Sequence, residues 1–246
     1  MALARTHSVA LIGVTGQVVE IEVDIANGLV GLILVGLPDT ALREARDRIR
    51  AAIVNSGEQW PQRKITVGLS PASLPKRGSW FDMAIAIGVL AAAGRVPRAA
   101  VDRVMFFGEL GLDGRLRPVR GVLPAVAAAA KEGFGRVMVA APNAAEAALV
   151  PDVRVIAVSS LTGAADWLRG TPGLHDGGPV TELDGGQLPP AARAPGGRSS
   201  RDGAMATPDL AEMLGQATAR RAAEVCAAGG HHLSLLGPPG AGNTAL

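Results

Sequence analysis

The sequence predicts an α/β or α+β domain with a mixed β-sheet, followed by a linker and the beginning of a second domain. Strand-like and helix-like hydrophobic patterns alternate from about residue 2 to residue 170. Hydrophobic residues make up 48% of the 246 residues and aromatic residues only 3%, so the core must be built from aliphatic side chains. Such an alternation is typical of a sheet that is covered by helices.

The composition excludes several classes of protein. A single cysteine, Cys226, excludes an internal disulfide and a thiolate metal cluster, and it indicates a reducing compartment. A formal charge of +2 is too small to indicate nucleic-acid binding by itself. No signal peptide is visible, and the longest apolar run, residues 83–94, is too short to span a bilayer, which takes about 20 residues. We therefore expect a cytoplasmic protein without a membrane partner.

The first strands form a predicted hairpin. Residues 9–12 and 18–25 alternate or run apolar, and Thr15-Gly16 lies between them as a turn. Residues 29–35 form a third strand, which is so apolar that we expect it to be covered on both faces.

A helix follows this third strand. Gly36-Leu37-Pro38-Asp39 opens the helix, with Pro38 suited to its first turn, and Asn55-Ser56-Gly57 ends it. Its arginines alternate with carboxylates, which is typical of an exposed face with ordinary salt bridges. The buried stripe is Leu42, Ala45, Ile49, Ala52 and Ile53, and the charged face consists of Arg43, Arg46, Arg48 and Arg50 with Asp39, Glu44 and Asp47.

Strands and helices continue to alternate up to residue 168. The helix over residues 82–93 is apolar all round, which predicts that it lies in the interior. Asp113-Gly114 marks a turn between two strands. The remaining elements are strands at 64–69, 104–108, 117–119, 136–140 and 153–158, helices at 122–131 and 161–168, and a short helix near Asn143.

A Gly- and Pro-rich stretch separates two regions. Residues 171–206 contain eight Gly, five Pro and almost no large apolar side chains, so they cannot offset the entropy of ordering. We therefore predict a first domain at residues 1–170, a flexible linker at 171–206 and the start of a second domain at 207–246.

A basic stretch between Glu58 and Asp82 contains no carboxylate and could contact the phosphates of DNA. An alternative is that it is a solvated strand edge and loop. Trp60 and Trp80 flank the stretch and could stack on bases, or they could anchor the core or an interface. The candidate DNA contacts are Arg63, Lys64, Lys76 and Arg77.

Several short motifs are distributed along the two predicted domains. They are Pro75-Lys-Arg-Gly-Ser-Trp-Phe-Asp-Met-Ala84, Phe107-Gly-Glu-Leu110, Arg117-Pro-Val-Arg-Gly-Val122, Gly36–Asp39, Ser70–Ala72, Asp209-Leu210, Gln216, Gly229–His232 and Gly237–Gly242. Together they resemble the motifs of the YifB/ComM family of magnesium-chelatase-like AAA+ proteins, and the resemblance covers residues 1–170 and 207–246. It implies an N-terminal domain with the fold of the Lon protease domain, which is related to domain 2 of ribosomal protein S5.

The likeness to Lon raises the question of peptidase activity. The resemblance implies that Trp80 stands where the nucleophilic serine belongs, with Ser79 one residue early, and that Leu123 stands in place of the general-base lysine. A serine hydroxyl without a base is a poor nucleophile. A Lon-like peptidase is therefore the least favoured function, and we expect Ser79 to cap the helix that follows it.

The strongest chemical motif is a phosphate-binding loop after the strand-like Leu233–Leu236. Its glycine spacing lets backbone N–H groups hold phosphates at a helix N-terminus, with Thr244 on Mg²⁺. Asn243 replaces the lysine that should reach the β- and γ-phosphates, so we expect weak nucleotide binding. The loop consists of Gly237, Pro238, Pro239, Gly240, Ala241, Gly242, Asn243 and Thr244.

The resemblance implies an ATP-driven hexameric motor that uses ATP and Mg²⁺ and acts on DNA as a branch-migration helicase. Only four residues follow Gly242, so we expect this chain to lack ATPase activity, through a truncated frame, a frameshift or an engineered boundary. An alternative is a stand-alone module that binds DNA or a partner without catalysis. No metal site is expected, because the four histidines His7, His175, His231 and His232 are scattered.

Overall fold

The computed structural model describes residues 2–12, 15–36, 40–74, 76, 78–171, 173, 175, 177–186, 217–231 and 233. The chain divides into two compact units, residues 1–194 and residues 195–246. In the second unit the described element is helix α7 (Ala217–Gly229). None of the described helices has the length and apolar character needed to cross a membrane.

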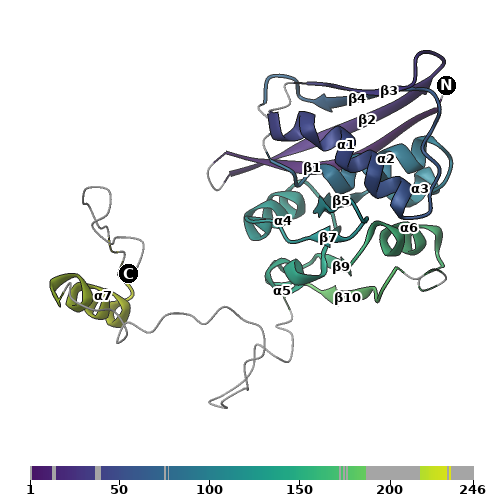
Figure 1. The fold of residues 1–246 in the computed structure, drawn as a ribbon. Helices are drawn as coiled ribbons and strands as arrows, with labels where there is room; N and C mark the ends of the chain where they lie inside the picture. Colours follow the sequence, from purple (N-terminus) through teal and green to yellow (C-terminus); the bar gives the residue numbers. More distant parts are fainter. Residues whose placement is uncertain are drawn as a thin grey trace. The chain divides into compact units, whose positions relative to one another are not determined.

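The first unit is built on an eight-stranded mixed sheet with the strand order β10-β9-β8-β5-β1-β2-β4-β3 (Figure 1). The pairs β1–β5, β5–β8, β8–β9 and β3–β4 are parallel, and the other pairs are antiparallel. The predicted α/β architecture with a mixed sheet is confirmed. The strands are β1 (Ala2–Ile12), β2 (Thr15–Ala26), β3 (Gly31–Val35), β4 (Lys64–Ser70), β5 (Val104–Phe107), β8 (Arg136–Ala140), β9 (Arg154–Val158) and β10 (Thr181–Asp184).

Helices cover both faces of this sheet. Thr6 Oγ1 on β1 donates to Ala84 O of α2 at 2.9 Å, so α2 packs on the face that carries Thr6. Gly16 lies on the opposite face of β2, where a Cβ would meet Ala128 of α4. The helices of the unit are α1 (Thr40–Asn55), α2 (Asp82–Ala92), α3 (Arg98–Val101), α4 (Val122–Lys131), the 3₁₀ helix η1 (Ala141–Asn143), α5 (Ala144–Ala147) and α6 (Leu161–Arg169).

The predicted hairpin of β1 and β2 is confirmed, with Val9 opposite Val18. However, the prediction placed the turn between these two strands too far along the chain. Gly16 pairs with Leu11 and Thr15 with Ile12, so both turn residues of the prediction belong to β2. Strand pairing continues beyond the apolar alternation because it depends on main-chain groups.

The prediction for β3 is wrong in one respect. β3 lies at the edge of the sheet, and Ile33 and Val35 are 46% and 48% exposed, while Leu32 is buried. An apolar run shows that a strand can be buried on both faces, but it does not show which strands lie in the middle of a sheet.

Helix α2 is fully buried, as its sequence predicts. The predicted stripe of α1 is buried at Ala45, Ile49, Ala52 and Ile53. The chain reaches α1 through Gly36, which has a φ of 103°, and a Cβ there would overlap the main chain of Leu69. Only glycine fits this approach.

The turn at Asp113-Gly114 joins a separate two-stranded ribbon. β6 (Glu109–Leu110) pairs with β7 (Leu116–Arg117), whereas β5 belongs to the main sheet. The strand predicted at 104–108 therefore does not pair with the one predicted at 117–119.

The predicted linker begins too early. β10, at Thr181–Asp184, pairs antiparallel with β9, and Leu183 packs against the core. Arg154 of β9 lies 3.6 Å from both Glu182 and Asp184. This polar strand is held by main-chain hydrogen bonds and by ion pairs, which leave no signal in hydrophobic periodicity. Residues 187–206 of the predicted linker lie outside the described residues.

The close contact between α2 and the sheet gives a test. A Cβ on Gly88 would lie 2.7 Å from Val23 Cγ2. We expect Gly88→Ala to lower the free energy of unfolding by about 1–2 kcal/mol, because overpacking costs more than alanine gains in a helix. Gly135→Ala is the control, because a Cβ there has no neighbour within 4 Å. Urea unfolding measures both, and equal stability of the two variants would contradict this packing.

Candidate functional site

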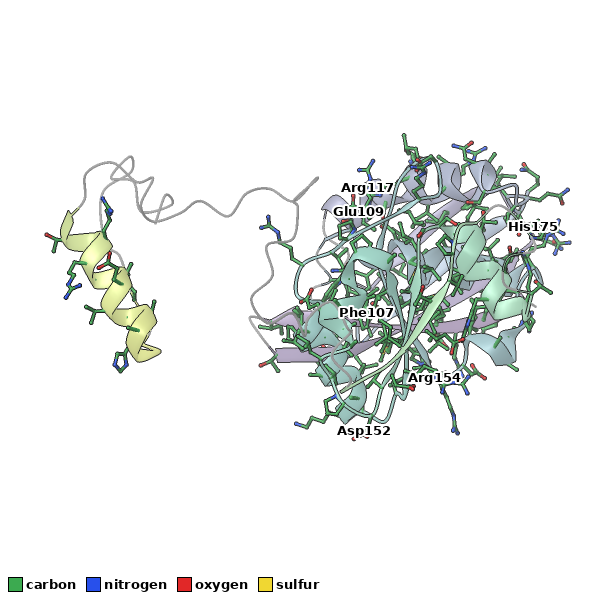
Figure 2. The ribbon with its side chains drawn as sticks, turned by 90° about the horizontal axis from the view of Figure 1, so that it is seen from below. Phe107, Glu109, Arg117, Asp152, Arg154 and His175 are labelled. Atoms are coloured by element: carbon green, nitrogen blue, oxygen red, sulfur yellow. The ribbon has the colours of Figure 1, made fainter. Side chains whose placement is uncertain are left out.

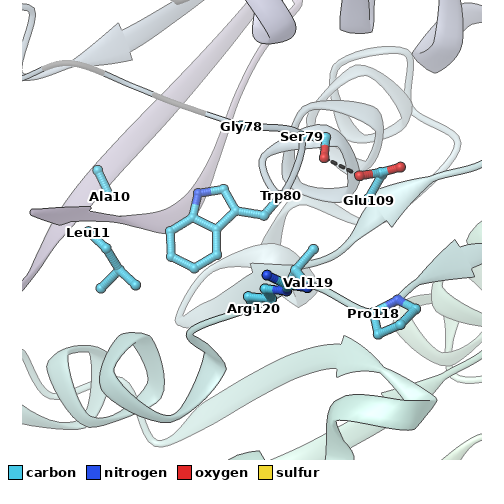
Figure 3. Close-up of a pocket in the computed structure, with 9 residues that line it drawn as sticks. All are labelled: Ala10, Leu11, Gly78, Ser79, Trp80, Glu109, Pro118, Val119 and Arg120. Atoms are coloured by element: carbon cyan, nitrogen blue, oxygen red, sulfur yellow. Dashed lines mark hydrogen bonds between the residues drawn. The ribbon is translucent and has the colours of Figure 1, made fainter. Parts of the chain in front are cut away.

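A pocket of about 390 Å³ opens beside Trp80 (Figure 3). Four segments that are distant in sequence form it: the end of β1, the turn before α2, β6, and the stretch after β7. β1 pairs with β5 at His7, and the pocket lies further along β1. Its lining residues are Ala10, Leu11, Gly78, Ser79, Trp80, Glu109, Pro118, Val119 and Arg120.

Ser79 does not have the role that its sequence position predicts. Its hydroxyl donates to Glu109 Oε2, and Phe81 occupies the N-cap of α2 without a side-chain hydrogen bond. The capping prediction is therefore wrong: the serine lies three residues before the helix, and its side chain turns to the carboxylate of β6. Glu109 lies 3.7 Å from Arg117 Nη1, and the two side chains are side by side (Figure 2).

The pocket lacks the chemistry of a Lon-type dyad. Its described lining contains neither lysine nor histidine, and Leu123 lies on α4 with 38% of its surface exposed. Glu109, the one carboxylate among the described lining residues, accepts a hydrogen bond from the Ser79 hydroxyl and is also paired with Arg117. A peptidase reaction gains no support from this arrangement.

Trp80 forms an apolar wall of the pocket. It is 8% exposed, and its ring centroid lies 6.0 Å from those of both Phe81 and Phe107. Its Nε1 has no hydrogen-bond partner among the described residues. Trp60 is also buried, at 7% exposed. Both indoles thus fit the anchor alternative better than base stacking.

A buried ion pair involves Asp82, two residues after the pocket residue Trp80. Asp82 is fully buried, and its Oδ2 and Oδ1 lie 2.7 Å and 3.1 Å from Arg48 Nε and Nη2. Leu110 N donates to the same carboxylate at 3.2 Å. The prediction that Arg48 belongs to an ordinary exposed salt-bridged face is wrong, because this arginine turns inward from α1 to the first residue of α2.

Burial dominates the protonation of Asp82. Loss of hydration raises the pKa of the Asp82 carboxyl to about 6, although the Arg48 guanidinium and the Leu110 amide act in the opposite direction. The pair therefore joins α1, α2 and β6 through a group that titrates close to neutrality.

Lys76 is not a surface cation. It is fully buried, its Nζ donates to Pro71 O, and burial lowers the pKa of its ammonium group. Lys76 therefore cannot present its charge to a phosphate, and this candidate DNA contact is wrong. Arg77 lies outside the described residues.

Arg63 and Lys64 are exposed at the start of β4. Arg63 lines a second pocket of about 440 Å³ together with Arg95 and Trp60. The described lining of this pocket contains no carboxylate. Glu58, which is close in sequence, is paired with Arg169. Two of the four predicted DNA contacts are therefore available at one end of the sheet.

The described residues locate neither a metal site nor the nucleotide site. Among the described residues, no three His, Cys, Asp or Glu side chains gather in a way that could hold a metal ion. The predicted phosphate loop, Gly237–Thr244, lies outside the described residues.

The buried pair predicts a pH-dependent mutational effect. The folded-state pKa of Asp82 is above its ordinary value of 3.8, so the contribution of this group to stability is complete below pH 3.8 and is lost as the pH rises through about 6. Arg48→Met leaves the carboxylate without its cation. We expect the free energy of unfolding to fall by about 3–5 kcal/mol at pH 8 and by less at pH 5, where Asp82 is largely protonated.

Arg136→Met is the control, because Arg136 is an exposed arginine at the start of β8 and has no ion pair among the described contacts. Its effect should stay within about 0.5 kcal/mol at both pH values. Denaturant unfolding at pH 5 and pH 8 measures both variants. An Arg48→Met effect that is independent of pH would be incompatible with the assigned titration.

Comparison with known proteins extends these observations. The family model described as subunit ChlI of Mg-chelatase matches residues 21–143, half of the chain, and a second model, magnesium chelatase subunit ChlI, matches residues 209–246. The chain is 49% identical to protein Rv2897c of Mycobacterium tuberculosis, 39% to competence protein ComM of Haemophilus influenzae and 37% to YifB of Escherichia coli. Each match covers all 246 residues and 45% of the relative, so the chain spans about half the length of these proteins. The chain belongs to the magnesium-chelatase-like family of the YifB and ComM proteins.

Proposed function

We propose that this chain is the N-terminal part of a YifB/ComM-type AAA+ ATP-binding protein that acts on DNA, and that its first unit contacts the DNA backbone through Arg63 and Lys64. The family role implied is ATP-driven branch migration by a hexameric helicase. The observation that carries the proposal is the exposed basic end of the sheet: Arg63 and Lys64 are adjacent and exposed at the start of β4, and Arg63 shares with Arg95 a pocket whose described lining contains no carboxylate.

Strand register supports this location. Lys64 lies opposite Ala26 of β2, and the next positions along β2 on the same face are Asp24, Glu22 and Glu20. Phosphates would be repelled by this acidic row and attracted to the strand ends beyond it. The proposed DNA contact is therefore limited to the end of the sheet that carries Arg63, Lys64 and Arg95.

The nucleotide part of the proposal depends on the sequence of residues 237–244. The glycine spacing supports ATP binding with Mg²⁺ near Thr244. Asn243 can donate hydrogen bonds but supplies no charge, so we propose that this chain binds ATP weakly and does not hydrolyse it. A module that binds DNA or a partner without any nucleotide chemistry is the second candidate, which the same basic end would also serve.

The DNA contact is tested by neutralising its two cations. We expect Arg63→Gln with Lys64→Gln to weaken binding of a fluorescent 30-base-pair DNA duplex about tenfold or more. Each phosphate contact that is lost also loses the favourable release of a counterion from the DNA. The slope of log affinity against log salt should fall by about 2. Fluorescence anisotropy over a range of NaCl concentrations measures both quantities.

Lys131→Gln with Arg136→Gln is the charge-matched control, because both residues are exposed, in the last turn of α4 and at the start of β8, away from β4 in the fold. It should leave affinity and salt slope close to those of the unchanged chain. If the double variant and the control bind equally well, the basic end of the sheet is not the DNA contact.

The nucleotide proposal has its own test. We expect Asn243→Lys to strengthen binding of a fluorescent ATP analogue with Mg²⁺ by about 10- to 100-fold, because a hydrogen bond to a charged group contributes about 1.5–3 kcal/mol. Asn243→Gln, which lengthens the side chain without adding a positive charge, should not strengthen ATP binding. Failure of the lysine variant to gain affinity would favour the module without nucleotide chemistry, and the DNA test would be unaffected.

A further inference from the structure

The two edges of the sheet differ in how they are protected. An edge strand presents unpaired N–H and C=O groups, and soluble proteins protect such edges with charges, proline or bulges. The β10 edge carries Glu182 and Asp184, which pair with Arg154. At the β3 edge, residues 25–37 contain no charged residue and no proline. By this measure one edge is protected and the other is not.

The exposed side chains on the β3 edge are large and apolar. Leu29 is 93% exposed, Val30 51%, Ile33 46% and Val35 48%. Ile33 and Val35 share one face of the sheet with Thr66 and Gly68 of β4. Contiguous exposed apolar side chains on an unpaired strand are typical of an interface.

We propose that the β3 edge is an interface between two copies of this chain, which pair antiparallel through β3 about a two-fold axis at Ile33. In this register Gly31 of one copy lies opposite Val35 of the second copy, and the two Ile33 residues face each other. The pairing joins two eight-stranded sheets into one and satisfies the main-chain groups of both edges. The inference does not depend on the proposed DNA or nucleotide function.

The charges beside β3 favour a second copy as the occupant. A groove along β3 is bordered on α1 by Arg46, Asp47 and Arg50. Asp47 is 82% exposed and Arg46 56%. Because both signs are present, a two-fold axis can bring the carboxylate of each copy towards an arginine of the other. A strongly acidic or strongly basic partner would meet like charges on the same surface.

Disulfide trapping tests the register. In a Cys226→Ser background, Ile33→Cys should form a covalent dimer under mild oxidation, because opposed Cα atoms in an antiparallel pair lie about 4.5–5.5 Å apart, within the range of a disulfide. Leu112→Cys, also in the Cys226→Ser background, is the control, since Leu112 is 60% exposed in the turn between β6 and β7. Non-reducing gels should show a dimer for Ile33→Cys and a monomer for Leu112→Cys.

Sedimentation equilibrium of the full chain gives an independent measurement. We expect a concentration-dependent mass of about twice the monomer, which Ile33→Lys or Val35→Lys abolishes and Leu112→Lys retains, with unchanged circular dichroism spectra. A monomer at all concentrations, or a dimer that persists in both β3 variants, would overturn the proposal. Equal cross-linking of the two cysteine variants would also overturn it.

Discussion

The arrangement around the pocket depends on the buried ion pair between Arg48 and Asp82. Arg48 lies in α1, Asp82 begins α2, and Leu110 of β6 donates to the same carboxylate. A carboxylate with no exposed surface is tolerated only when a cation and hydrogen bonds surround it. The position of α1 against α2 and the position of β6 are therefore coupled through one contact, in which burial raises the pKa of the Asp82 carboxyl to about 6 against the opposite effect of Arg48.

The same contact fixes the segment that carries Trp80. Gly108 N donates to Trp80 O, and Met83 N donates to Gly108 O, both at 3.2 Å. This segment is thus held by the end of β5 on one side and by Arg48 on the other. A Cβ on Gly108 would lie 2.9 Å from Leu116 Cδ2, so a larger residue there would have to displace the end of the Leu116 side chain. Several residues that mark the family in the sequence therefore have a structural role in this corner of the fold.

The sequence predicted much of the fold, because hydrophobic periodicity reports local burial. It located the hairpin, the buried helix α2 and the strands β4, β5, β7, β8 and β9, but not β6. It did not predict that β3 lies at an edge, because strand order depends on pairing between distant segments. The Arg48–Asp82 pair spans 34 residues, and although a carboxylate at the start of a fully apolar helix signals a need for a cation, four arginines of α1 were equivalent in the pattern. The prediction that Lys76 is exposed was wrong because lysine is almost never fully buried without a partner charge, and the sequence pattern gives no sign of such an exception.

The surface of the first unit divides into regions of different character, and the strand register relates them. Gly31 at the start of β3 lies opposite Lys64, so the basic end of the sheet adjoins the beginning of the apolar edge. In an antiparallel β3 pair, Gly31 of each copy faces Val35 of the other, which places the two basic ends at opposite ends of the paired strands. Four residue steps of about 3.3 Å separate Gly31 from Val35 along the strand, so the two Lys64 sites would be at least about 13 Å apart. A dimer of this kind would therefore offer DNA two separate backbone contacts related by two-fold symmetry. Because the two contacts would be linked, self-association through β3 would raise the affinity for DNA above that of a single contact.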